Sequence, residues 1–209
     1  EEQGYLRAWK KMEDFRRRGL ARSIGVSNYH IHHLEDVLRE AEVVPAVDQV
    51  ECHPELTQVE LADFCAGKGI AFEPWSPLGA GKLLEDPELL SIAASYGKTV
   101  AQLILRWGLQ RGFICIPKSV HRERIESNAQ VFDFELSAAD MDRIFALNKN
   151  ARVGADPETF PFQPRIQKTG PLPIPLGSAG ASFCPRFTPA AGCGPPPSGP
   201  RRPRPRPGR

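Results

Sequence analysis

Two spacings of hydrophobic residues alternate along the first 150 positions of the sequence. Hydrophobic residues three or four apart are typical of helices with one buried face, and short apolar runs are typical of buried strands. The helical spacing predicts helices over residues 4–18 and 30–41, from 57, from 99, over about 122–128 and from 137. The apolar runs predict strands at 23–26, 45–50, 70–75 and 112–116. Strand and helix therefore alternate four times.

Residue types that favour helix ends support these boundaries. Gly19 follows the first helix, where glycine readily adopts the left-handed conformation that ends a helix. Thr57 and Glu60 have the spacing of a capping box, in which side chains bond the free N–H groups of the first turn. Thr99 and Ser137 are predicted to cap two later helices.

Polar and aromatic residues follow each predicted strand. Strands alternating with helices predict an α/β fold with a parallel sheet, in which the carboxyl ends of the strands lie along one edge. These ends carry groups that can hydrogen-bond, stack or pair with an anion: Ser27, Asn28, Gln49, residues 51–53, Trp75, Ser76, Lys118 and Ser119. We therefore expect the functional site at this edge.

Four motifs in the same order make a family resemblance specific. They are Gly-Val-Ser-Asn-Tyr at 25–29, Asp-Gln-Val-Glu-Cys-His-Pro at 48–54, Trp-Ser-Pro-Leu-Gly at 75–79 and Ile-Pro-Lys-Ser-Val at 116–120. Together they resemble the aldo-keto reductase family, especially its bacterial 2,5-diketo-gluconate reductase-like members. The resemblance covers about residues 1–162 and implies the C-terminal half of a TIM (β/α)8 barrel, about four βα units.

The resemblance implies an oxidoreductase that uses NADPH to reduce a small aldehyde or ketone to an alcohol by hydride transfer. The family's catalytic aspartate, tyrosine, lysine and histidine belong to its first half, so no catalytic residue can be assigned in this chain. Neither Tyr5 nor Tyr29 lies in the motif of the catalytic tyrosine, and both are interpreted as packing residues. His53 is interpreted as fixing a loop at a strand end. The chain alone is expected to be inactive.

The resemblance also implies which residues contact the nicotinamide end of the cofactor. Ser27, Asn28 and Gln49 match positions that hydrogen-bond the carboxamide, which needs both donors and acceptors. Trp75 matches the aromatic position that stacks on the nicotinamide ring. The loop over the pyrophosphate is matched by Ser76, Leu78, Gly79 and Gly81.

A second group matches the adenosine end. Lys118, Ser119 and Arg124 match the residues that bind the 2′-phosphate, and these side-chain types suit a phosphate dianion. Val120 completes their motif, and Asn128 matches an adenine contact. Many family members have glutamate where this chain has Ser127, which predicts a modestly weaker contact to adenine.

The net charge of +2 combines two parts of opposite sign. Residues 163–209 hold eight basic residues and no acidic ones, which leaves 19 basic against 25 acidic residues in 1–162. The last 47 residues also hold 13 of the 21 prolines. Such composition predicts a disordered Pro/Gly/Arg-rich tail. It could bind proline-recognising modules or contact RNA, or it could be out-of-frame or readthrough sequence from a GC-rich gene; nucleic acid is the less favoured partner.

Other features exclude some classes of protein. No run of about 20 apolar residues predicts a membrane helix, and the first residues do not resemble a signal peptide. The absence of an initial methionine suggests that the true N-terminus precedes Glu1. Five cysteines without a CxxC pair indicate a reducing compartment, by default the cytoplasm.

Two questions remain open at this stage. His30, His32 and His33 have a spacing that does not align three ligands on one helix face, so no metal site is expected. The alternative to an enzyme is a non-catalytic product that binds NADPH weakly or binds partners through its tail. The oligomeric state and the particular carbonyl substrate are not predicted.

Overall fold

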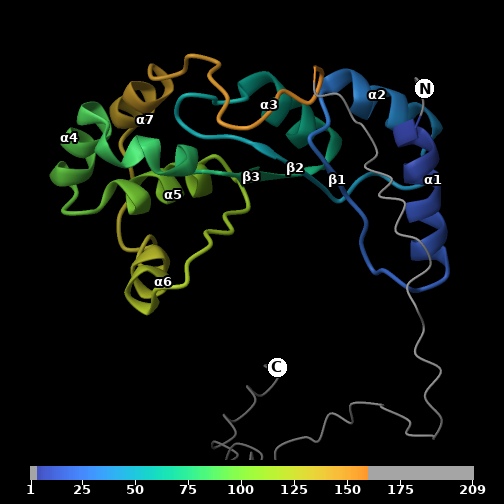
Figure 1. Cartoon of the computed structure of the whole chain (residues 1–209), viewed down its shortest axis with the longest axis horizontal. Helices are drawn as coiled ribbons and strands as arrows, with labels where there is room; N and C mark the ends of the chain where they lie inside the picture. The colour runs from blue at the N-terminus through green and yellow to red at the C-terminus, as the bar shows by residue number, and fades with distance from the viewer. Residues whose placement is uncertain (1–3, 160–209) are drawn as a thin grey trace, which may run out of the picture. The chain divides into compact units, whose positions relative to one another are not determined.

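The computed structural model describes residues 4–159, so the predicted tail at 163–209 lies outside the described residues. Figure 1 shows α1 and α2 at one end of the sheet and α4, α5, α6 and α7 toward the other. In chain order the elements are α1 (Gly4–Arg17), β1 (Val26–Ser27), α2 (Ile31–Glu40), β2 (Val47–Glu51), α3 (Val59–Lys68), β3 (Ala71–Trp75), the 3₁₀ helix η1 (Gly79–Glu85), α4 (Pro87–Ser95), α5 (Val100–Gln110), α6 (Arg122–Ala129) and α7 (Ala138–Phe145).

Three strands form a parallel sheet in the order β1-β2-β3, as the alternating pattern predicts. Ser27 pairs with Gln49, and Glu51 pairs with Trp75. The prediction of a fourth regular strand at 112–116 is wrong. The N–H of Ile114 donates a hydrogen bond of 2.9 Å to the carbonyl oxygen of Phe72 in β3, but this segment forms no continuous ladder with β3 within the described residues.

The first strand is shorter than the apolar run that predicts it, and the chain lies close against β2 just before the paired residues. A Cβ on Gly25 would lie 2.4 Å from Cγ1 of Val47 and 2.8 Å from the Val47 carbonyl oxygen. Only glycine therefore permits this approach, and regular pairing starts at Val26.

Most predicted helix ends are present. Gly19 has φ of 71°, and the Thr99 and Ser137 side chains accept hydrogen bonds from the first turns of α5 and α7. The capping box at Thr57 is wrong: α3 begins after Gln58, and Thr57 is buried.

Tertiary contacts account for the position of Thr57. Its N–H donates to Oδ1 of Asn148 at 3.2 Å, and its carbonyl oxygen accepts from Nη1 of Arg111 at 2.8 Å. Both partners lie far along the chain, so local spacing could not reveal them.

Two helices were not predicted, η1 and α4. The signal for α4 is nevertheless present in the sequence: Asp86 accepts hydrogen bonds of 3.0 Å from the N–H groups of both Glu88 and Leu89, and Pro87 occupies the first helical position. Leu89 and Ile92 then place one face of the helix in the core.

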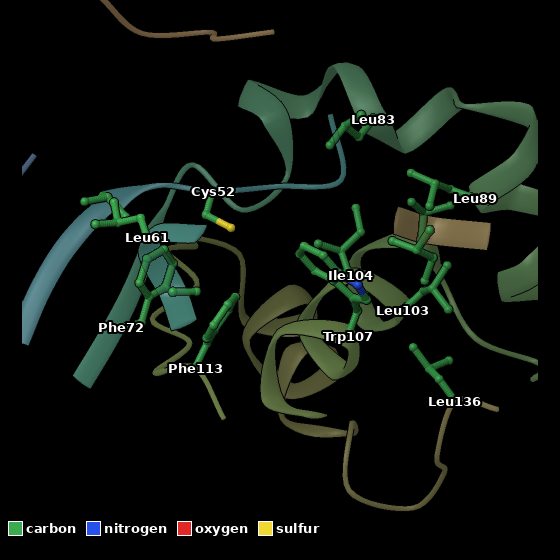
Figure 2. Packing of buried hydrophobic residues seen from close by; sticks show 14 of the residues in the cluster. Cys52, Leu61, Phe72, Leu83, Leu89, Leu103, Ile104, Trp107, Phe113 and Leu136 are labelled. Atoms are coloured by element: carbon green, nitrogen blue, oxygen red, sulfur yellow. The ribbon is translucent and has the colours of Figure 1, made fainter. Parts of the chain in front are cut away.

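The main hydrophobic core lies between β3 and the helices α3, α4, α5 and α7 (Figure 2). Trp107 and Ile104 of α5 are almost fully buried, with Phe72 of β3 and Phe113 packed close by. A smaller cluster joins α1 to α2 through Trp9, Leu6, Ile24 and Val37. No helix among residues 4–159 is long and apolar enough to cross a lipid bilayer.

Candidate functional site

Polar side chains cross one face of the sheet in a row. Ser27, Gln49 and Glu73 occupy paired positions on the three strands, so their side chains lie on the same face. The Ser27 hydroxyl donates to the Gln49 carbonyl oxygen at 2.9 Å, and Nε2 of Gln49 donates to Oε1 of Glu73. Gln49 and Glu73 are half-buried and Ser27 is exposed, so this face presents both donors and acceptors.

The carboxyl ends of β1 and β3 are joined by side chains. Nε1 of Trp75 donates to Oδ1 of Asn28 at 2.7 Å. Asn28 has φ of 61°, in the left-handed region that asparagine tolerates better than most residues. This bond fixes the edge of the indole and leaves Trp75 half-buried at the strand ends.

The segment after α7 returns to the same strand ends. Glu51 of β2 is buried, and its carboxylate accepts from the N–H of Val153 at 2.6 Å and of Gly154 at 3.2 Å. Its Oε1 also lies 3.0 Å from Nε2 of the buried His53. Gly154 lies against Trp75, since a Cβ at 154 would be 2.4 Å from Cη2 of the indole.

The sequence prediction missed this role of Glu51. Glu51 stands in a recognised motif at a strand end, but its backbone partners are about 100 residues further along the chain. The expectation for His53, that it fixes a loop at a strand end, agrees with its burial and with its contact to Glu51. Tyr5 instead donates to Oδ2 of Asp36 at 2.5 Å, which raises the pKa of the Tyr5 hydroxyl to about 12.

The loop after β3 has an unusual backbone. Ser76, Gly79, Ala80 and Gly81 all have positive φ, of 50°, 57°, 55° and 90°. The N–H of Gly79 donates to the Ser76 carbonyl at 2.9 Å, and the N–H of Gly81 donates to the Leu78 carbonyl at the same distance. Consecutive left-handed residues make a tight turn with little side-chain bulk, which permits a ligand to approach the backbone closely.

A cavity of about 720 Å³ lies between η1, α4, the start of α5 and α6. It brings together six of the residues predicted to bind a cofactor: Leu78, Lys118, Ser119, Val120, Arg124 and Asn128. The remaining predicted residues do not line it. Ser27, Asn28, Gln49 and Trp75 lie along the strand ends, and the loop of Ser76, Gly79 and Gly81 lies between the two groups in the sequence.

Two cations that line this cavity, Lys118 and Arg124, are available to an anion. Within the part of the chain that the structure describes, neither the Lys118 ammonium nor the Arg124 guanidinium has a carboxylate within ion-pair distance. The Ser119 hydroxyl accepts from the N–H of His121 at 3.1 Å, beside the first turn of α6. Cations next to a helix N-terminus form a site that suits phosphate.

A family model described as Aldo/keto reductase family matches residues 1–149. This chain belongs to the aldo/keto reductase family. The described fold agrees with this membership, since parallel strands followed by helices carry the matching motifs at their carboxyl ends.

Curated relatives of this aldo/keto reductase chain include two proteins of Bacillus subtilis strain 168. One, named an uncharacterized oxidoreductase YtbE, is 54% identical over 158 residues, which is 76% of this chain and 56% of that protein. The other, named glyoxal reductase, is 52% identical over 158 residues, which is 76% of this chain and 57% of that protein. This chain therefore spans less than two thirds of the length of these relatives.

Solved structures also match the fold of this chain. The apo form of Gox0644 matches with a TM-score of 0.73 and 41% identity, over 77% of this chain and 60% of that one. A mutant of Gox0644 in complex with NADPH matches with a TM-score of 0.72 and 42% identity, over 75% and 58%. The fold is thus that of a large part of an aldo/keto reductase barrel.

Proposed function

We propose that this chain forms the NADPH-binding side of an aldo/keto reductase that reduces a small carbonyl compound to an alcohol. The observation that carries the proposal is the cavity in which Lys118 and Arg124 meet Ser119 and the first turn of α6. NADPH differs from NADH by one phosphate, and a lysine, a forked guanidinium and a hydroxyl are suitable partners for that dianion.

The residues fit the rest of the nucleotide in chemical terms. Asn28, Gln49 and Ser27 offer donors and acceptors of the kind that a carboxamide requires. Trp75 offers a flat apolar face beside them. When bound, the reduced nicotinamide would supply the hydride. The loop of Ser76, Leu78, Gly79 and Gly81 would admit the pyrophosphate to its backbone.

In the reaction this chain binds and orients the nucleotide, and it does not transfer the proton. Neither tyrosine beside α2 is placed to donate one: Tyr5 is hydrogen-bonded to Asp36, and Tyr29 packs edge-on against its ring. Burial raises the pKa of Tyr29, which further opposes acid–base catalysis at neutral pH. We therefore expect NADPH binding without turnover from the 209-residue chain.

The proposal is tested by titrating the 209-residue chain with NADPH and, separately, with NADH, using the nucleotide's fluorescence. We expect NADPH to bind at least tenfold more tightly. Arg124→Met and Lys118→Met should each reduce that ratio severalfold by weakening NADPH alone. Arg122→Met is the matched control, because Arg122 is on the same helix but is 90% exposed and paired with Glu126. Equal affinity for the two nucleotides would overturn the proposal, as would an unchanged ratio in both variants.

A second measurement tests whether the chain binds NADPH without catalysing its oxidation. Incubating the chain with NADPH and glyoxal, the compound in the name of one relative, should give no NADPH oxidation above the uncatalysed rate. Catalysed oxidation would show that the chain contains its own proton donor.

A further inference from the structure

Three histidines and two carboxylates gather where α2 begins, and none of them is among the residues proposed to bind NADPH. One oxygen of Glu158, Oε1, lies 3.4 Å from Nε2 of His32, 4.0 Å from Nδ1 of His33 and 3.8 Å from Nε2 of His30. Nε2 of His30 also lies 3.9 Å from Oδ1 of Asp156. The segment after α7 thus places its carboxylates among the imidazoles of α2.

The four separations are longer than good N–H···O hydrogen bonds, which are about 2.7–3.2 Å. Ligand atoms of His32, His33 and Glu158 all lie within 4.8 Å of one another. Around a tetrahedral zinc ion with bonds of about 2.0–2.2 Å, neighbouring ligand atoms are roughly 3.4 Å apart. Small side-chain rotations would bring the three groups to that geometry.

One imidazole nitrogen of this cluster lacks a partner in the described part of the chain. Nε2 of His30 is buried and has no hydrogen-bond partner among the residues described. A buried polar atom without a partner is unfavourable unless a further group satisfies it.

We propose that His32, His33 and Glu158 bind a divalent cation of the zinc class, with His30 and Asp156 beside them as supporting groups. Two imidazoles and one carboxylate favour Zn²⁺, Ni²⁺ or Cu²⁺ over Mg²⁺ and Ca²⁺. Nδ1 of His33 accepts from the N–H of His30 at 3.2 Å, and coordination would exchange that hydrogen bond for a bond to the metal.

The surroundings leave room for a further ligand. A cavity of about 460 Å³ is lined by His30, His32 and Glu158, together with the polar side chains of Asn148 and Asn150. A water molecule could enter there and complete the coordination. The bound cation would tie the segment that follows α7 to the start of α2. The sequence predicted no metal because the histidine spacing alone is unsuitable, and the third ligand comes from the other end of the described chain.

The test is a calorimetric titration of the chelator-treated, untagged 209-residue chain with Zn²⁺. We expect one saturable site, weakened at least tenfold by His32→Gln and by Glu158→Gln. His121→Gln is the matched control, because His121 is an exposed histidine at the start of another helix and should leave the site unchanged. Absence of saturable binding, or equal affinity in wild type and Glu158→Gln, would overturn the proposal.

Two further measurements distinguish this site from two alternatives. One alternative is zinc bound by cysteines, and the other is a variant that fails to bind zinc because it misfolds. Co²⁺ should give weak visible bands without the intense near-ultraviolet band of a thiolate ligand; a thiolate band would contradict the proposed ligands. Zn²⁺ should also slow trypsin cleavage after Arg152 severalfold in the wild-type chain and in His121→Gln, but not in Glu158→Gln. Equal protection in all three would overturn the proposal.

Discussion

Gly154 lies so close to the indole of Trp75 that a single added methyl group would overlap Cη2 at 2.4 Å. The contact joins a segment that follows the last helix to an aromatic residue at the end of β3. The position of the ring that we propose for nicotinamide stacking therefore depends on a residue nearly 80 positions away.

We predict that Gly154→Ala displaces the Trp75 indole and breaks its hydrogen bond to Asn28. Acrylamide quenching of tryptophan fluorescence should increase, because Trp9 and Trp107 are buried and Trp75 is the ring that would become accessible. Affinity for NADPH should fall severalfold. Gly67→Ala is the control, since no atom lies within 4 Å of a Cβ at that position. Unchanged quenching in Gly154→Ala would contradict the prediction.

Glu51→Gln should destabilise the chain by about 1–3 kcal/mol, the usual cost of leaving buried hydrogen-bonding groups unpaired. The carboxylate accepts from Val153, Gly154 and His53, whereas an amide would direct its own N–H groups at one of these donors. Urea denaturation measures the loss. Trypsin should also cleave faster after Arg152, because residues 153 and 154 would lose their anchor. Wild-type stability and cleavage would contradict the role assigned to Glu51.

The burial of Asp48 predicts that the stability of the chain falls as the pH rises. Its side chain is fully buried, Oδ1 accepts only a long 3.5 Å bond from the Tyr29 N–H, and Oδ2 has no partner within the described residues. Burial raises the pKa of Asp48 from 3.8 to about 7. Between these two values the folded chain binds more protons than the unfolded chain, so the free energy of unfolding decreases with pH.

Asp48→Asn should remove this dependence, because an amide stays neutral. Each pKa unit corresponds to about 1.4 kcal/mol, so the variant should be more stable than wild type by a few kcal/mol at pH 8. Near pH 4 the two should have similar stability. Denaturation in urea at pH 4, 6 and 8 measures the difference, and a difference independent of pH would contradict the assignment.

Arg111→Lys should destabilise the chain by roughly 1–3 kcal/mol. The guanidinium lies over the rings of Phe113, Trp107 and Phe145 at 4.3, 4.7 and 5.0 Å and donates to the Thr57 carbonyl. A lysine keeps the charge but has no planar group to stack on these rings. Thermal or urea denaturation measures the effect, with the exposed Arg122→Lys as control. Equal stability of the two variants would show that the stacking is unimportant.

The sequence by itself predicted most of the helices, the three strands of the sheet and the two groups of candidate residues. Helical spacing and local caps such as Thr99 and Ser137 act within a few residues, so they can be recognised from the sequence. The order of the motifs indicated the family, which the matching family model confirms. The family motif predicted that Lys118, Ser119 and Arg124 act together, and all three line one cavity.

Only the tertiary structure decided which distant groups meet. Thr57 fits a capping box by spacing, yet Asn148 and Arg111 hold its backbone instead. Residues 112–116 are apolar enough for a strand, but pairing requires a neighbour along the whole segment, and β3 supplies a single described hydrogen bond. Glu158 reaches the histidines of α2, and Gly154 reaches Trp75, because the buried Glu51 carboxylate bonds Val153 and Gly154 and holds the end of the described chain at the strand ends. Such contacts depend on separation in space, which spacing along the sequence does not encode.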